Sequence, residues 1–184
     1  MNITTKIDFT RALEVSGFKR EIAGKQCFGK AVRALELMQQ TRKGLFVYGT
    51  NGVGKTCFCR AVDKVFGLGA TFVRLLDPTQ LPLITDEYFL DRLFGGGAVI
   101  LDDVGSEHQR NDYGVVCEPV SDFIGRWYEK YEKHLSIGNL LVVNTNLSAE
   151  QFAARYSMRT VSRLKSLCCF WKMEGEDKRF ATVV

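Results

Sequence analysis

The strongest indication of the fold is the segment Gly49-Thr-Asn-Gly-Val-Gly-Lys-Thr56. It matches the pattern G-x-x-x-x-G-K-[ST] at every specified position. Its three glycines let the main chain bend so that successive N–H groups point at one anion. The sequence therefore predicts a phosphate-binding loop over residues 49–56.

The segments on either side of this loop support that prediction. An apolar strand is expected at Leu45–Tyr48, and an amphipathic helix from Lys55 to about Phe66, whose positive end faces the same anion. Lys55 can reach the β- and γ-phosphates, and the Thr56 hydroxyl can bind Mg²⁺. We expect ATP and Mg²⁺ as cofactors, with the nucleotide contacted by Gly49, Thr50, Asn51, Gly52, Val53, Gly54, Lys55, Thr56 and Cys57.

Two adjacent carboxylates follow a second apolar run. Ala98–Leu101 is bounded by glycines and acids, as a buried parallel strand should be, and Asp102 and Asp103 stand at its end. We expect Asp102 to hold the Mg²⁺ and Asp103 to orient or deprotonate the attacking water. A turn or helix cap is the alternative role for this pair.

A third apolar run, Leu140–Val143, is followed by Asn144 and Asn146. An amide at this position can hydrogen-bond the γ-phosphate or the attacking water. Asparagine is also a common turn or cap residue, so the residues alone leave both roles open.

Strands and helices alternate along the rest of the chain, which predicts an α/β fold with a five-stranded parallel sheet between helices. The first 25 residues are weakly patterned and are expected to form a short arm. The remaining strands are expected at Ala70–Leu76 and Cys168–Met173, and helices at Phe28–Gln40, Thr85–Phe94, Val115–Lys133, Ala149–Tyr156 and Thr160–Ser166.

Composition indicates a globular protein, with 46% hydrophobic and 25% charged residues. The chain contains no apolar run long enough to span a membrane, and Met1–Phe9 does not resemble a signal peptide, so we expect a cytoplasmic location and no membrane partner. The six cysteines include no C-x-x-C pair and are expected to be free, mostly buried thiols. Residues 151–184 hold seven Lys/Arg and three Asp/Glu, an excess that suits either an anionic partner or a solvated basic face.

These motifs together resemble AAA+ ATPases, specifically the DnaC/IstB-like branch of helicase loaders and transposition helpers. The resemblance runs from about Gly44 to Arg179 and rests on GTNGVGKT (49–56), AVILDDVG (98–105), VVNTNLS (142–148), RTVSRL (159–164) and GEDKR (175–179). It implies a P-loop NTPase with the AAA+ core at 44–184, preceded by an arm and helix at 1–43. Few residues follow Met173, so no C-terminal helical lid domain is expected.

The resemblance also implies roles for individual residues. Asn146 matches the asparagine that senses the γ-phosphate, in preference to Asn144. Arg163 looks like the arginine finger that enters the neighbouring subunit's ATP site, which implies a homo-oligomer, and Arg159 resembles its usual companion. Arg179 is similar in place to a second nucleotide-sensing arginine.

The implied function is ATP hydrolysis coupled to DNA, with a replicative helicase or a transposase as partner. In similar loaders the loop after the acidic pair touches single-stranded DNA, and here it contains His108, Arg110 and Tyr113. An exposed polar loop is the alternative for that segment. The alternatives for the whole chain are a nucleotide-switched adaptor or inhibitor with little hydrolysis and, less favoured, a small-molecule kinase.

Overall fold

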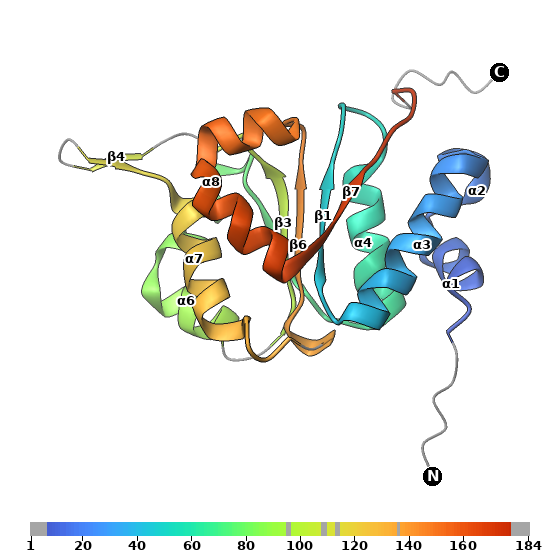
Figure 1. Ribbon diagram of the computed structural model, residues 1–184, viewed down its shortest axis with the longest axis horizontal. Helices are drawn as coiled ribbons and strands as arrows, with labels where there is room; N and C mark the ends of the chain where they lie inside the picture. Colours follow the sequence, from blue (N-terminus) through green and yellow to red (C-terminus); the bar gives the residue numbers. More distant parts are fainter. Residues whose placement is uncertain (1–6, 95–96, 108–109, 113–114, 136, 178–184) are drawn as a thin grey trace, which may run out of the picture.

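A five-stranded parallel sheet forms the centre of the computed structural model, which describes residues 7–94, 97–107, 110–112, 115–135 and 137–177 (Figure 1). The strands lie in the order β2-β3-β6-β1-β7. Their bounds are β1 Gly44–Tyr48, β2 Thr71–Arg74, β3 Val99–Val104, β6 Leu141–Thr145 and β7 Cys168–Lys172. All four neighbouring pairs are parallel, which confirms the predicted α/β class and sheet.

Helices cover both faces of this sheet because its strands are apolar on both sides. In β1, for example, Leu45 and Val47 belong to one hydrophobic cluster and Phe46 to the other. The first cluster includes helices α1 Phe9–Ser16, α3 Lys25–Thr41 and α4 Lys55–Phe66. The second includes α5 Pro82–Thr85, α6 Glu87–Phe94, α7 Pro119–Tyr131 and α8 Ala149–Leu167.

The N-terminal segment is more ordered than the predicted arm. Residues 9–16 form α1 and Arg20–Ala23 form the short helix α2. Asp8 caps α1 by accepting hydrogen bonds from two main-chain N–H groups. Phe9, Leu13 and Phe18 are buried in the same cluster as α4, so the arm prediction is wrong for this segment. The division of the chain at residue 44 stays a prediction.

Helix α7 begins later than predicted. Residues 115–117 form strand β5, Val115–Cys117, which pairs with β4, Arg110–Asp112, in an antiparallel hairpin outside the main sheet (Figure 1). Pro119 then starts the helix, because proline lacks the N–H group that the first helical turn does not need. The hydrophobic run at 115–117 therefore belongs to a strand rather than to the helix.

Two other helical segments are divided. The expected helix 85–94 corresponds to α6, which begins two residues later because Asp86 separates it from the short helix α5. In α8, Ser157 has non-helical dihedrals (φ 75°, ψ 154°), so the helix is broken between the two halves predicted from the sequence. None of the helices in the described ranges has the length and apolar character needed to cross a membrane.

Candidate nucleotide-binding site

The predicted phosphate loop connects the end of β1 to the start of α4. Gly49 has a φ of 151° and lies so close to the main-chain oxygen of Met173 that a Cβ atom would collide with it. Gly54 has a φ of 100° and directly precedes the helix. A side chain at either position would strain the loop, because neither backbone conformation suits an L residue with a Cβ.

The side chain of Lys55 is buried within the loop and is held by three oxygen atoms. Its Nζ donates to the main-chain oxygens of Gly49 at 2.9 Å and Thr50 at 2.7 Å. It also donates to the side-chain oxygen of Asn146 at 2.6 Å. The ammonium group is therefore positioned at the mouth of the loop, where phosphate oxygens can replace these acceptors. Asn146 therefore lies beside Lys55, and its contact with a nucleotide stays a prediction.

Behind the loop, Thr56 and Asp102 form a pair. The Thr56 hydroxyl donates to Oδ1 of Asp102 at 2.8 Å, and Asp102 has no solvent exposure. The other carboxylate oxygen, Oδ2, is buried without a hydrogen bond, and the Nε atom of Arg74 lies 3.6 Å from it. An incompletely satisfied buried carboxylate beside a hydroxyl is a donor set that suits Mg²⁺, which prefers one or two carboxylates plus phosphate oxygens. The residues present fit the predicted ion.

Strand β3 continues past Leu101, where the sequence placed its end, through Asp102 and Asp103 to Val104. Its pairing with β6 shifts between Leu101 and Val104, so the two acids lie in a bulge. Asp103 adopts a φ of 58° there. Bulges redirect side chains, and this one buries Asp102 while turning Asp103 toward a cavity.

Asn144 holds this bulge in place. Its side-chain oxygen accepts from the main-chain N–H of Asp103 at 3.0 Å, and its amide nitrogen donates to Asp102. The same nitrogen lies 3.6 Å from the sulfur of Cys59, and burial raises the pKa of that thiol to about 12. Asn144 is fully buried, so it acts on the acids and not directly on a nucleotide.

The predicted side chains meet at one cavity of about 320 Å³. It is lined by Gly52, Gly54, Lys55, Thr56, Cys57, Asp103 and Asn146. A second hollow of about 360 Å³ includes Thr50 and Asn146 and extends to the start of α8. Val53 differs from its neighbours, because its side chain is buried in the core and anchors the loop.

The segment after β7 lies across the phosphate loop, which sequence reasoning did not anticipate. The Met173 N–H donates to the Tyr48 oxygen at 2.8 Å. A Cβ atom at Gly52 would collide with the carboxylate of Asp177. The spacing between the loop and the GEDKR segment offered no direct signal for this contact. The predicted nucleotide residue Arg179 lies outside the described residues.

A buried polar network ties the loop after β3 to α8. Arg155 donates to the main-chain oxygens of Gly105 at 2.8 Å and Glu107 at 2.6 Å. The Glu107 carboxylate accepts from Tyr156 and from the Gly105 N–H. Burial is the main cause that raises the pKa of the Tyr156 phenol, followed by its bond to Glu107. This network was missed because its members are far apart in the sequence.

The predicted arginine finger does not line the cavity of its own chain. Arg163 lies over α7, with Nη2 3.2 Å from Glu129 and the guanidinium 5.6 Å from the Tyr128 ring centre. Arg159 is exposed and has no ion pair with another described residue. Neither observation tests their role between subunits.

The predicted DNA contacts are only partly visible. Arg110 begins strand β4 of the hairpin, whereas His108 and Tyr113 lie outside the described residues. Figure 1 shows β4 beyond the edge of the helices at the left of the molecule. The hairpin thus replaces the expected loop at residues 110–112 and the expected start of the helix at residues 115–117.

Solved structures of other proteins have a similar arrangement of strands and helices. The DnaC helicase loader aligns with 80% of this chain and 90% of its own, with a TM-score of 0.56 and 18% identity. A Streptococcus pyogenes serotype M3 protein described as a primosome component aligns with 81% of this chain and 80% of its own, with a TM-score of 0.57 and 19% identity. This chain has the DnaC fold. No protein-family model and no curated protein sequence matches it.

The DnaC fold agrees with the predicted P-loop NTPase core. At 18% and 19% identity the likeness establishes the arrangement of strands and helices. It leaves the chemistry to be argued from the side chains around the loop.

Proposed function

We propose that this chain binds ATP with Mg²⁺ and hydrolyses it to act on DNA, as a cytoplasmic DnaC-like helicase loader. The observation that carries the proposal is the convergence of Lys55, Asp103 and Asn146 on one cavity, with Asp102 directly behind Thr56. The DnaC fold supports it, since the two similar structures are a helicase loader and a described primosome component.

Each residue has a defined task in this mechanism. The loop N–H groups and the start of α4 bind the β-phosphate, and Lys55 exchanges its carbonyl acceptors for phosphate oxygens. Thr56 and Asp102 hold the ion, and Asp103 orients the attacking water or takes its proton. ATP with Mg²⁺, when bound, supplies the transferable phosphoryl group and neutralises its charge.

Hydrolysis is proposed to need a second copy of the chain. Arg163 is held by Glu129 and Tyr128 on its own α7, and we propose that it leaves them to enter a neighbour's site. An arginine supplied in this way is worth about 10³–10⁵ in rate in phosphoryl-transfer enzymes. This arrangement also favours the second candidate, a nucleotide-switched adaptor that hydrolyses slowly while Arg163 stays bound to α7. An IstB-like transposition helper would share the same site.

The test compares the ATPase rates of three variants. Asp103→Asn should bind ATP normally and lose about 10²-fold or more of the hydrolysis rate, because asparagine tolerates the left-handed backbone but cannot take a proton. Asp91→Asn, an exposed acid on α6, should have no effect. Arg163→Ala should remove any rise of activity per subunit with protein concentration.

The outcomes separate the candidates. ATP-dependent assembly with hydrolysis near zero in the wild type would support the adaptor and overturn the motor function. An Asp103→Asn protein that hydrolyses ATP at the wild-type rate would overturn the proposed mechanism.

The DNA function needs its own test, with a fluorescent oligo-dT strand as the probe. We expect binding that weakens with salt and in the double variant Arg110→Ala plus Tyr113→Ala, because cations and stacked rings hold single strands. Arg126→Ala, an exposed arginine on α7, is the matched control. Unchanged affinity in the double variant would remove the hairpin from the proposal.

A further inference from the structure

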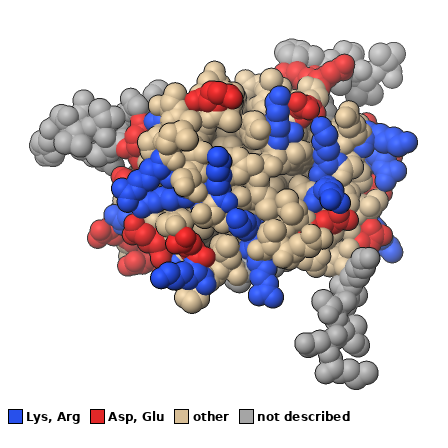
Figure 2. All heavy atoms as spheres, in the orientation of Figure 1, with Lys and Arg blue, Asp and Glu red and all other residues tan. Residues whose placement is uncertain are grey.

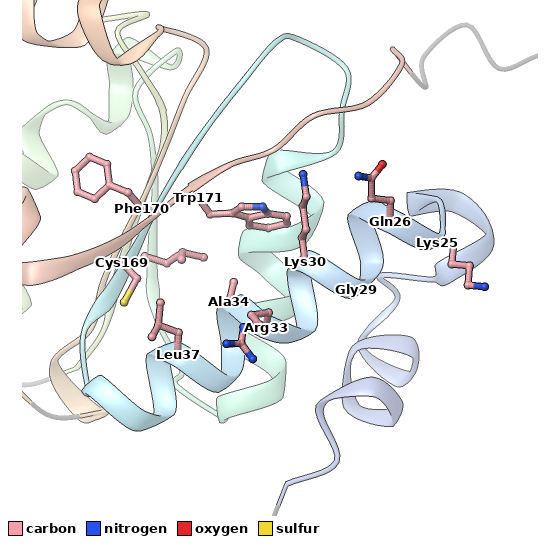
Figure 3. A pocket seen from close by; sticks show the side chains of 11 residues that line it. Lys25, Gln26, Gly29, Lys30, Arg33, Ala34, Leu37, Cys169, Phe170 and Trp171 are labelled. Carbon is pink, nitrogen blue, oxygen red and sulfur yellow. The ribbon is translucent and has the colours of Figure 1, made fainter.

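A groove of about 470 Å³ lies between α3 and β7, away from the phosphate loop (Figure 3). It shares no lining residue with either hollow beside the loop. Its lining is largely apolar and includes Ala34, Leu45 and Trp171. Leu37, at its lower end, exposes 43% of its surface. An apolar groove left open to water is a feature of binding surfaces.

The groove exists because α3 carries small residues where it faces β7. Gly29 is the clearest case, since a Cβ atom added there would meet nothing within 4 Å. Ala34 lies one and a half helical turns further along and is also small. Glycine within a helix costs about 0.5–1 kcal/mol relative to alanine. No neighbouring atom excludes a side chain at Gly29, so packing does not require glycine there. The lack of a side chain leaves an open notch in the helix surface.

Strand β7 forms the other wall and is an edge of the sheet. It pairs with β1 alone among the described residues. Figure 3 shows Trp171 pointing toward α3 and Phe170 pointing away. Phe170 stacks on Phe46 on the opposite face, with ring centres 4.6 Å apart. At residue 170 the groove is therefore bounded by the main chain of an edge strand, which can pair with another strand.

Three cations stand along the groove on α3. Arg33 is 87% exposed, and its contact with Glu36 is long, at 4.0 Å. Lys25 has no ion pair with another described residue. Lys30 lies 3.4 Å from Glu174, which follows β7. One carboxylate already binds at this rim, so the charge of the groove suits acidic side chains.

We propose that this groove binds an extended, acidic segment of a partner protein, which adds to β7 as a sixth strand. Its main chain pairs with the edge of β7, one apolar side chain fills the notch at Gly29, and carboxylates face Lys25 and Arg33. The groove runs along α3 from Lys25 to Leu37, about 18 Å at 1.5 Å per residue. That length matches five to six residues of strand, at about 3.3 Å each.

The lining favours such a peptide over single-stranded nucleic acid. Nucleic acid needs exposed ring faces for its bases and a line of cations for its phosphates. Cations do stand along this groove, but Trp171 is the one ring among its described lining residues that points toward α3. That ring already packs edge-on against Phe58, with centres 4.7 Å apart. Strand addition uses main-chain bonds for affinity and alternate side-chain pockets for specificity, which this groove provides. The inference does not depend on nucleotide binding.

The probe is the capped peptide Thr-Glu-Thr-Val-Thr-Glu-Thr, in which the valine and both glutamates lie on one face of the strand, and the reporters are Trp171 and Cys169. Trp127, the other tryptophan, is fully buried, so a change in fluorescence reports Trp171. Cys169 lines the groove, so a bound peptide should slow its alkylation. Two control peptides are the lysine-for-glutamate version and a version N-methylated at alternate residues, which cannot complete strand pairing.

The matched variants change the groove without changing the core. Gly29→Leu fills the notch and Arg33→Glu reverses the rim charge, and each should weaken binding about tenfold or more. Arg126→Glu, an exposed arginine on α7, should leave binding unchanged. Circular dichroism and Gly29→Ala, which should fold at least as well as the wild type, exclude a loss of structure as the cause.

Five results would overturn the proposal. One is that the acidic peptide is found to bind no better than the basic one. Another is that the Gly29→Leu protein is found to bind the acidic peptide as well as the wild type does. The N-methylated peptide binds equally well, which removes strand pairing. Oligo-dT binds in place of the peptide and is lost in Gly29→Leu, which makes the occupant a nucleic acid. Sedimentation shows self-association that Gly29→Leu abolishes and the peptide does not affect, which makes the occupant a second copy.

Discussion

The cavity at the phosphate loop and the groove between α3 and β7 are built in opposite ways. The cavity lies at the carboxyl ends of the strands and brings together polar groups such as Lys55 and Asp103, which the surrounding chain holds through hydrogen bonds. The groove lies along the side of the sheet, where Gly29 and Ala34 leave apolar space and charges stand only on the rim.

Acidic and basic side chains also gather on different parts of the surface. Figure 2 shows Asp and Glu side chains gathered at the lower left, and Lys and Arg spread over the centre and right of this face. In Figure 1 these regions correspond to α6 and α7 on one side and to α3 and β7 on the other. The cavity depends on residues that several strands place together, whereas the groove is formed mainly by one helix and one edge strand.

The largest expected effect is a loss of ATP binding at the cavity when Lys55 is replaced, with no change in peptide binding at the groove. Lys55→Ala should weaken ATP binding by about 10²-fold or more, because the loop loses the cation that faces the phosphates. Titration calorimetry with ATP and Mg²⁺ measures this loss. Lys64→Ala, on the outer side of the same helix, is the matched control, and peptide binding in the groove should be normal in both variants. Equal ATP affinity in Lys55→Ala and Lys64→Ala would contradict the assignment of the cavity.

The next effect distinguishes the two asparagines within the cavity region. Asn144→Ala should lower the free energy of unfolding by about 1–3 kcal/mol, because the Asp103 N–H loses the acceptor that Asn144 supplies and the buried Asp102 carboxylate loses one of its hydrogen-bond donors. Asn146 is exposed, so Asn146→Ala should keep the stability and reduce hydrolysis by about tenfold or more. Urea unfolding and an ATPase assay on the same samples separate these effects. The assignment is wrong if the two substitutions change stability equally.

The smallest effect uses one thiol in each region. ATP with Mg²⁺ should slow alkylation of Cys57 severalfold and leave Cys169 unchanged, whereas the acidic peptide should do the reverse. Cys59 and Cys168 should not react at neutral pH, because burial raises the pKa of both thiols and thiolate is the reactive form. Mass spectrometry of each cysteine measures the rates. Protection of both Cys57 and Cys169 by ATP would mean that the two regions are coupled.

Several elements could be predicted from the sequence because their signals are local. The helix after the phosphate loop was predicted to within its observed bounds, Lys55–Phe66, and the break in α8 was anticipated as two separate helices. The helix at 115–133 was wrong at its start because a strand with apolar residues precedes Pro119. The helix α1 was missed because its pattern is short and its burial depends on α4.

The features of the candidate site also divide into those that local motifs predict and those that depend on distant residues. Lys55, Thr56 and the two acids follow motifs whose spacing carries their chemistry. The bulge at Asp103, the support from Asn144 and the contact of Asp177 with Gly52 involve residues distant in sequence. No local pattern specifies them, because each depends on which strands become neighbours.

Local patterns in the sequence were enough to predict a phosphate-binding loop, an acidic pair after a buried strand and a parallel α/β sheet. These features follow from glycine conformations and apolar periods, which act over a few residues. It is the packing of distant segments that buries Asp102 behind Thr56, places Arg163 on α7 and leaves an open groove beside the edge of β7. Packing and desolvation act between distant segments, so these outcomes appear only once the chain has folded.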